Sequence, residues 1–432
     1  FLKCIATNGR QYLQLSKMDD VKPDAIMQQV FTFVNNILAR GHNGRVSGSE
    51  RSSGSTGGSI ALGDSSFENS VHRTSSKDGQ SAPLRIRTYN VIPLAPNAGI
   101  MEVVKRSVTL AQFLHKGPDS AFARYAKKNH WSNGDCTRKL SAVAKQSVDR
   151  KLREFERVCN HHPPLLRHFF QESFPNARGW FERRQNYARS VAVTSIAGYV
   201  LGIGDRHCDN IMLDVRSGEL VHIDFGMIFD QGTMLHVPET VPFRLTRNII
   251  DGLGVLGTEG TFRRCCERAL VVLRESADKL VMILNVVVHD PLFQWTCTIP
   301  ELIRRQGGQI RQGTSEANSP ELLQTGSHSS EQTDDTQEDD DTDELEPTFD
   351  DNSDEEHTEK DAARVLLRIR QKLRGQDDVA SEALAVEGQV RNHVQQKWKK
   401  IAAIICVFYS TRRHPHHHHA LSTVCVCVCN FA

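Results

Sequence analysis

Apolar side chains recur every three or four residues in three parts of the chain, and this spacing predicts helices there. The first part follows Asp24, and its apolar positions are Met27, Val30, Phe31, Val34 and Leu38. The second runs from Trp180 to Leu201, where Gly202 is expected to end the helix. The third begins at a capping box over Thr358–Asp361, and its apolar positions are Val365, Leu366, Ile369 and Leu373.

Alternating or β-branched runs predict strands elsewhere. Tyr12–Ser16 is expected to form a strand that ends at Lys17, and residues 84–104 alternate between apolar and polar positions. Strands near the N-terminus followed by a longer helical part predict the α+β class, with a small β-rich lobe and a larger helical lobe.

Two further strand-like runs predict a hairpin. Asn210–Asp214 and Leu220–Asp224 flank a loop that contains Ser and Gly, which is typical of a hairpin connection. If the hairpin pairs symmetrically about Ser217, Asn210 lies directly opposite Asp224, at a Cβ separation of roughly 5 Å. One cation would then bridge the amide oxygen of Asn210 and the carboxylate of Asp224.

Length and composition allow a folded domain of this size. The chain has 432 residues, of which 39% are hydrophobic and 24% charged, enough for a two-lobed domain with disordered segments. The net charge of +1 favours neither binding nor avoidance of polyanions, and no direct nucleic-acid site is evident. No run of eighteen apolar residues predicts a membrane span. The cysteines form no CxxC pair, so neither a disulfide framework nor a zinc site is indicated.

The candidate chemistry lies in the segment from Gly202 to Asp214 and in the triplet that begins at Asp224. Asp205 is placed to orient or deprotonate a hydroxyl group, and His207 to stabilise charge on a phosphoryl group in transfer. Asn210 and Asp224 offer the oxygen ligands that Mg²⁺ prefers. Together these are the residue types that metal-assisted phosphoryl transfer needs. The alternative is a polar turn before an ordinary hairpin.

Several motifs resemble one known family. The order Asp-Arg-His at 205–207 and the segments 237–247, 250–254, 262–267 and 290–295 are similar to those of the phosphatidylinositol 3-kinase-related protein kinases. The resemblance implies a bilobal kinase fold and the use of ATP with Mg²⁺ or Mn²⁺. It further implies phosphorylation of Ser or Thr followed by Gln in protein substrates, in nuclear DNA-damage signalling. A homodimer and a DNA-break sensor complex are partners implied by the resemblance alone.

The resemblance also implies nucleotide-binding residues. Lys17 corresponds to the lysine that holds the nucleotide phosphates, and Asp19 and Asp24 to the acids that orient it. The connection from Lys17 to Asp24 is one residue shorter than in the family, which leaves the position of Asp19 open, and a solvated surface turn is the alternative for this stretch.

The hinge between the lobes is expected at Met101–Val104, where backbone groups of Glu102, Val103 and Val104 would bind adenine. A plain strand is the alternative here, and the family often has Trp at the position of Val103.

The domain organisation follows from these expectations. The predicted parts are a partial N-lobe over 1–104 with a disordered insertion at 41–83, a C-lobe over 105–300 with a catalytic loop at 202–214 and an activation segment at 224–247, a disordered acidic linker over 301–360, a helix and the start of a degenerate FATC-like segment over 361–396, and an aberrant tail over 397–432. The His and Cys runs of the tail suggest either metal binding or, more simply, translated noncoding sequence.

Two other functions remain open. A phosphoinositide kinase would share the fold, but an anionic headgroup calls for basic residues in the activation segment, and none lies between Asp224 and Pro242. A catalytically inactive fragment or scaffold is the second, because the chain begins inside an expected strand without the loop that covers the phosphates in this family. The chain by itself is accordingly expected to be inactive or nearly so.

Overall fold

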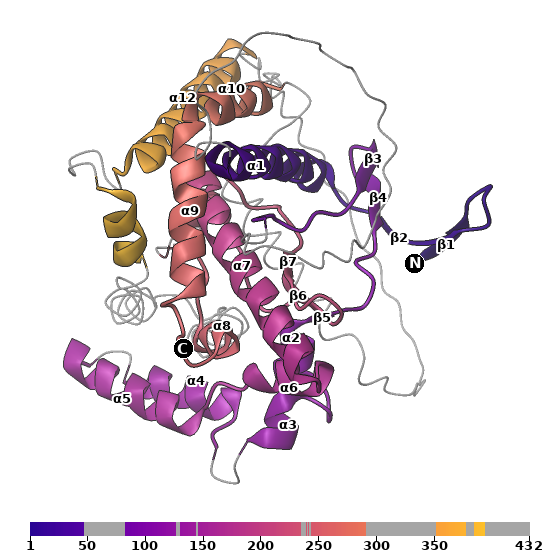
Figure 1. The fold of residues 1–432 in the computed structure, drawn as a ribbon. Helices are drawn as coiled ribbons and strands as arrows, with labels where there is room; N and C mark the ends of the chain where they lie inside the picture. The colour runs from indigo at the N-terminus through magenta and orange to yellow at the C-terminus, as the bar shows by residue number, and fades with distance from the viewer. Residues whose placement is uncertain are drawn as a thin grey trace, which may run out of the picture.

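The computed structural model describes residues 1–46, 83–126, 130–143, 146–234, 239, 241, 243–290, 351–376 and 384–393. The core of the predicted insertion (47–82), most of the acidic linker (301–350) and the tail (397–432) lie outside these residues. The α+β prediction is confirmed, because a small sheet-bearing part at the N-terminus adjoins a larger helical part (Figure 1).

The N-terminal part is an antiparallel sheet of four strands in the order β1-β2-β4-β3. Its strands are β1 (Leu2–Ile5), β2 (Gln11–Lys17), β3 (Val91–Ala95) and β4 (Ala98–Glu102). As predicted, the second strand ends at Lys17, which lies opposite Gly99 of β4. Helix α1 (Lys22–Val46) packs beside β3, and the five apolar positions predicted for it are buried. The helix continues to Val46, so the expectation of disorder from residue 41 was wrong for its first residues.

Residues 83–90 form an extended segment and not a strand (Figure 1). The predicted strand over 84–104 is confirmed only from Val91 onward. The backbone at Ile86 and Tyr89 bonds to the side chains of Asn35 and Gln28 in α1, and the backbone bond to a neighbouring strand comes at the end of the segment, where the Asn90 carbonyl accepts from the Glu102 amide of β4 at 2.8 Å. The alternation of apolar and polar residues predicted a strand. In the structure the apolar residues Leu84, Ile86 and Tyr89 are buried on one side of the segment, toward α1.

A second sheet of three strands carries the predicted hairpin. It pairs β5 (Ser107–Thr109) with β6 (Ile211–Asp214), and β6 with β7 (Leu220–His222). The hairpin exists, but the predicted register was wrong by one residue. Ile211 pairs with His222, and the Ile223 amide donates to the Asn210 carbonyl at 3.0 Å. Asn210 therefore lies opposite Ile223, and Asp224 follows the end of the ladder.

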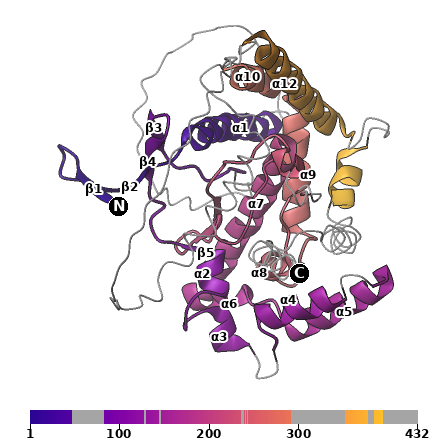
Figure 2. The ribbon, with the colours of Figure 1, turned by 180° about the vertical axis from the view of Figure 1, so that it is seen from behind.

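The remaining elements are helices arranged around α7. They are α2 (Leu110–Leu114), α3 (Ala121–Tyr125), α4 (Asn133–Ala142), α5 (Val148–His161), α6 (Arg167–Ser173), α7 (Ala177–Leu201), η2 (Gln231–Met234), α8 (Arg247–Leu253), α9 (Thr261–Glu275), α10 (Ala277–Val288), α12 (Asp351–Arg374) and a helical stretch at 386–393. Helix α7 crosses the molecule with α9 along it, and α10 and α12 lie together beyond α9 (Figures 1 and 2).

Burial of α7 explains its central position. All but one of its residues from Tyr187 to Leu201 are buried, and Tyr187 itself packs on Phe170 with ring centroids 5.0 Å apart. The predicted end at Leu201 is confirmed, with Gly202 as the left-handed cap. Helix α12 begins at Asp351, seven residues before the predicted capping box, so the expected disordered linker ends earlier than residue 360. Of the helices described, none has the length and apolar character needed to cross a bilayer.

Candidate active site

The turn at residues 202–207, which carries the candidate residues Asp205 and His207, begins where α7 ends. Gly202 has a φ of 62°, and a Cβ there would lie 2.3 Å from the amide nitrogen of Asp230. That amide donates to the Gly202 carbonyl at 2.9 Å, and the Phe229 amide donates to Leu201 at 3.0 Å. Only glycine combines this conformation with this close approach. The end of α7 is thereby joined to the segment that follows Asp224.

Asp205 lies on this turn in a left-handed conformation, with a φ of 54°. Its amide donates to Oε1 of Glu239 at 2.9 Å, and its carbonyl accepts from Nδ2 of Asn210 at 3.0 Å. Burial raises the pKa of Asp205, and the charge of Asp224 adds to the rise, while His207 and Arg206 oppose it. A carboxylate with a raised pKa is a better proton acceptor than a fully solvated one.

His207 faces Asp205 across the turn. Its Nε2 lies 4.0 Å from Oδ2 of Asp205, and its Nδ1 accepts from the Asp209 amide at 3.2 Å. Because Nδ1 is an acceptor, the neutral ring carries its proton on Nε2. The donor atom of His207 and the acceptor atom of Asp205 therefore lie on the same side of the turn.

Arg206 connects the turn to the strand that leads into Asp224. Its guanidinium donates to the Gly204 carbonyl at 2.8 Å, to the Ile223 carbonyl at 2.8 Å and to the Asp224 carbonyl. It also lies over the ring of Phe225, 5.1 Å from the centroid. These bonds hold the backbone on both sides of the site, and Asn210 and Asp224 lie at the same end of the hairpin although they are not opposite in the ladder.

Asp224 adopts a φ of 61° just after β7. The following amide, of Phe225, donates to Oδ1 of Asp24 at 3.4 Å, and the Tyr89 hydroxyl donates to the same oxygen at 2.9 Å. Asp24 is only 2% exposed. Its pKa is raised to about 6, by burial first and then by the charge of Asp224. The two carboxylates are thus electrostatically coupled.

Lys17 lies among these acids. Its Nζ is 3.0 Å from Oδ2 of Asp19. Burial alone would lower the pKa of Lys17, but Asp224, Asp19 and Asp24 outweigh it and raise the pKa. Asp19 is 61% exposed, so it lies at the solvent edge, whereas Asp24 lies inside. The predicted group of Lys17, Asp24 and Asp224 is assembled in the fold.

The proposed metal ligands fit a divalent cation. Nδ2 of Asn210 is used as a donor to Asp205, which leaves the amide oxygen to face a cation. The charge of Asp224 contributes to the raised pKa values of Asp24 and Asp205, which marks a crowding of negative charge that a cation would relieve. In the described part of the chain no three His, Cys, Asp or Glu side chains are arranged to enclose a metal. Mg²⁺ bound with a nucleotide needs only one or two protein ligands.

The predicted hinge joins the two sheets. The Glu102 side chain is exposed and accepts from the side chain of Asn90 at 2.9 Å. The Val103 amide donates to Leu13 at 3.3 Å, and the Val104 carbonyl accepts from the Ser107 hydroxyl at 2.6 Å. The segment is therefore connected to both sheets, and its role in binding adenine stays a prediction.

Sequence reasoning missed three residues of this site. Tyr89 binds Asp24, Arg206 binds the carbonyl groups beside Asp224, and Glu239 binds the Asp205 amide. Burial, followed by the charge of Asp205, raises the pKa of Glu239 to about 7. Arg206 and Glu239 belong to motifs that carried the resemblance, and that was the available signal. The partners of these two residues are distant in the sequence: Arg206 bonds to the Ile223 carbonyl and Glu239 to the Asp205 amide. The bond of Arg206 to Gly204, within the turn, is the local one.

Comparisons with known proteins agree with this geometry. A family model described as phosphatidylinositol 3- and 4-kinase matches residues 74–297. "Serine-protein kinase ATM" of Sus scrofa is 35% identical over 91% of this chain, and "Serine/threonine-protein kinase tel1" of Schizosaccharomyces pombe is 37% identical over 90%. The chain spans 11% and 12% of these two relatives.

Solved structures give the same result. A structure described as the open conformation of CtTel1 superposes with a TM-score of 0.65 at 30% identity, covering 94% of this chain and 12% of that one. The FAT and kinase domain of CtTel1 gives a TM-score of 0.63 at 28% identity, covering 100% of this chain and 22% of that one.

Proposed function

The chain belongs to the phosphatidylinositol 3- and 4-kinase family, and from this premise we propose that it is the kinase region of a protein serine/threonine kinase. The reaction is transfer of the γ-phosphate of ATP to a Ser or Thr hydroxyl in a protein. One observation carries the proposal: the turn of Asp205 and His207 is bonded to Asn210 and, through Arg206, to the backbone of Asp224. These bonds support an arrangement in which a base, a charge-stabilising donor and two metal ligands surround one point.

Each residue has a role that follows from its position. Asp205 accepts a hydrogen bond from the substrate hydroxyl and takes its proton as the phosphoryl group departs from ATP. His207, with its proton on Nε2, donates to an oxygen of the phosphoryl group. Lys17 places its ammonium on the nucleotide phosphates, and Asp24 holds it from the buried side.

Asn210 and Asp224 would hold Mg²⁺ or Mn²⁺. The cation, when bound, neutralises charge on the phosphate oxygens. The role of the protein in this proposal is to keep the two ligands at a fixed separation, and the hydrogen bonds of Arg206 to the Ile223 carbonyl and of Asn210 to the Asp205 carbonyl support it.

The substrate class is a finer part of the proposal. We propose Ser or Thr followed by Gln, within nuclear DNA-damage signalling, because the relatives are named ATM and Tel1 kinases. Related structures titled as a CtTel1 dimer and a Tel1 butterfly symmetric dimer support a homodimer. A DNA-break sensor complex as activating partner, and the lobe boundaries near 104 and 300, belong to the same proposal.

A lipid kinase is the second candidate, since the matching family model is named for phosphatidylinositol kinases. The absence of Lys and Arg between Asp224 and Pro242 in the sequence disfavours an anionic headgroup.

Radiolabelled Mg-ATP assays separate these functions. The chain, and a longer version with the upstream sequence of its gene, would be offered a Ser-Gln peptide, the matching Ser-Ala peptide and phosphatidylinositol vesicles. We expect label in the Ser-Gln peptide and in neither of the other two substrates. The longer version should give most of this labelling. Labelled lipid without labelled peptide would favour the second candidate. Equal labelling of both peptides would contradict the Gln preference.

A further inference from the structure

The 83–90 segment lies between α1 and the β6–β7 hairpin, and it bonds to both. Toward α1, Asn35 receives the Ile86 amide at 2.7 Å and donates to the Ile86 carbonyl at 2.9 Å, and Gln28 receives the Tyr89 amide at 3.0 Å. The side chains of Leu84, Ile86 and Tyr89 are buried. The segment is therefore fixed to the helix along most of its length.

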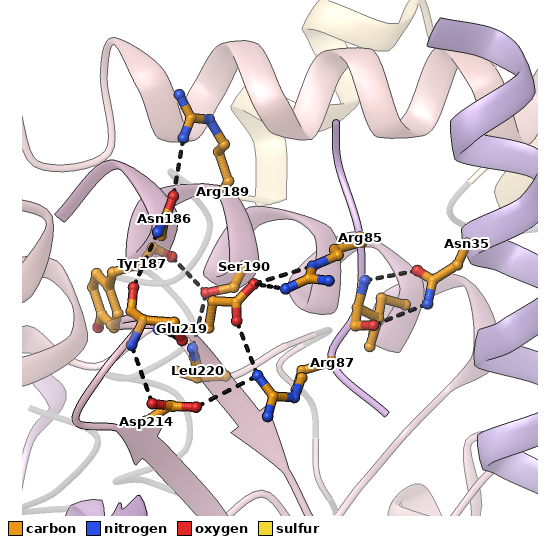
Figure 3. A network of polar contacts seen from close by, with 12 residues as sticks. Asn35, Arg85, Arg87, Asn186, Tyr187, Arg189, Ser190, Asp214, Glu219 and Leu220 are labelled. Atoms are coloured by element: carbon orange, nitrogen blue, oxygen red, sulfur yellow. Dashed lines mark hydrogen bonds and ion pairs between the residues drawn. The ribbon is translucent and has the colours of Figure 1, made fainter. Parts of the chain in front are cut away.

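The intervening arginines reach the other way, to the hairpin (Figure 3). Arg85 donates through Nε and Nη2 to Oε1 of Glu219, at 3.2 and 3.0 Å. Arg87 donates to Oε2 of Glu219 at 3.2 Å and lies 3.4 Å from Oδ2 of Asp214. Each oxygen of Glu219 thus has its own arginine. Two guanidinium groups balance two carboxylates at the closed end of the hairpin.

The Glu219 carboxylate is well shielded from water. Its side chain is 11% exposed, whereas that of Arg85 is 59% exposed. Burial alone would raise the pKa of Glu219, but Arg85, Ser217 and Arg87 together lower it. A shielded carboxylate is held in its charged form by its partners. Arg85 and Arg87, both in the 83–90 segment, therefore favour the ionised form of Glu219.

The same end of the hairpin is also bonded to α7 (Figure 3). Asn186 donates to the Ser217 carbonyl at 3.1 Å, and the Leu220 amide donates to the hydroxyl of Ser190 at 2.9 Å. The loop itself is closed by Asp214, whose Oδ1 receives the amides of Arg216 and Ser217 at 2.7 and 3.1 Å. The closed end is thus held between α7 and the 83–90 segment.

The open end of the hairpin carries Asn210 and Asp224. There α1 touches the hairpin a second time, because Asp24 receives the Phe225 amide. Helix α1 is therefore attached to the hairpin at both ends, directly through Asp24 and indirectly through Arg85 and Arg87. Two attachment points fix a direction, whereas one would allow rotation about it.

We propose that Glu219 is a positioning residue that sets the orientation of the β6–β7 hairpin against α1, and with it the separation of Asn210 and Asp224 from Lys17. The proposal rests on the proposed function in that these three residues receive Mg-ATP. Glu219 touches neither nucleotide nor substrate and acts through the hairpin. Arg85 and Arg87 are its partners in this role.

The test compares Glu219→Gln with four other variants of the full chain. Arg85→Met removes the partner whose guanidinium bonds, among the described residues, to Glu219 alone, and the double variant completes a cycle. Asn176→Ala removes the side-chain cap at the start of α7. This variant is the control for a general loss of stability, because the cap is remote from the hairpin. Glu259→Gln removes an exposed carboxylate that pairs with Arg263.

Two readouts are measured: amide hydrogen exchange of Ile223 and Phe225 without ligand, and calorimetric binding of Mg²⁺ with a non-hydrolysable ATP analogue. We expect Glu219→Gln to speed exchange of both amides at least 5-fold and to weaken nucleotide binding at least 5-fold. The double variant with Arg85→Met should give the same values as Glu219→Gln alone. Glu259→Gln should change neither, and Asn176→Ala should change neither beyond its effect on global stability.

The outcomes separate the two proposals. Unchanged exchange at Ile223 and Phe225 in Glu219→Gln would overturn the positioning role, and so would an equal effect in an equally destabilised Asn176→Ala. If the unaltered chain does not bind the Mg²⁺-nucleotide complex, the proposed function fails, and the exchange data still decide the role of Glu219.

Discussion

Lys372 of α12 donates to both carboxylate oxygens of Asp230, at 2.9 and 2.7 Å, and to the carbonyl of Tyr199 at 2.9 Å. Its side chain is 4% exposed. Asp230 follows the Asp224 segment and Tyr199 lies in the last turn of α7, so one ammonium joins three distant parts of the chain. Gln389 extends the connection, donating to the Tyr199 hydroxyl at 2.7 Å and to the Lys372 carbonyl at 3.0 Å.

Replacing Lys372 by Met should destabilise the protein by about 1–3 kcal/mol, because the buried Tyr199 carbonyl and the half-buried Asp230 both lose the ammonium as a donor. Urea unfolding measures the change. Arg370→Met removes an exposed cation from the same helix and should cost less than about 0.5 kcal/mol. Equal losses in the two variants would show that Lys372 contributes only a helix-surface charge.

Gly202→Ala should destabilise the protein more than Gly117→Ala. Both glycines have positive φ, but a Cβ at Gly117 meets nothing within 4 Å, whereas at Gly202 it meets Asp230. The conformational cost is about 1–2 kcal/mol at either position, and the clash adds about 1–3 kcal/mol at Gly202 alone. Thermal unfolding of both variants measures the difference in stability loss. Similar losses would mean that the backbone of the turn shifts to accommodate the Cβ at residue 202 without further cost.

The pH dependence of stability should reflect Glu239. Its pKa is raised to about 7 in the fold, so the folded state binds this proton more tightly than the unfolded state does. Stability from this group is fully present below the ordinary pKa of Glu, near 4.5, and is lost as the pH rises toward 7.

Glu239→Gln should therefore reduce the fall in unfolding free energy between pH 4.5 and pH 8 by up to about 3 kcal/mol, while its side-chain oxygen still accepts from Asp205. Glu182→Gln, at an exposed carboxylate paired with Arg178, should leave the fall unchanged. A pH profile of Glu239→Gln that matches the unaltered protein would contradict the burial of this charge.

In the longer version, offered the Ser-Gln peptide, Asp224→Asn should reduce phosphotransfer by about 100-fold or more, because it removes the negative charge that this ligand contributes to the Mg²⁺ site. Asn210→Ala should have a comparable effect. Circular dichroism should show both variants folded. Asp209→Asn, in the same turn but paired with Lys116 at 2.7 Å on the surface, is the matched control. Full activity of Asp224→Asn would refute the assigned metal ligand.

Local signals were sufficient to predict the elements that carry the site. The helical spacing after Asp24 and the glycine after Leu201 both correspond to observed helix features. The strand ending at Lys17 was also correct. Each of these depends on side chains within one element, where the spacing of apolar residues or the need for positive φ acts directly.

Long-range contacts could not be predicted in this way. The hairpin register was missed because its ladder is only three pairs long and because Asp224 leaves it with positive φ. The 83–90 segment was mistaken for a strand because its partners are side chains of α1. Glu239 reaches Asp205 from 34 residues away, and no local pattern encodes that distance.

The left-handed conformations near the site suggest how it responds to loss of a partner. Asp205, Asp224, Phe229 and Asp230 all have φ between 54° and 62°, and each such residue costs of the order of 1–3 kcal/mol. The backbone is thus strained at these four residues, and the hydrogen bonds of Glu239, Arg206 and Lys372 hold it in this conformation. Loss of one of these contacts is expected to let the backbone leave the left-handed conformation, so the position of the site residues depends on contacts far from Asp205 and Asp224 in the sequence.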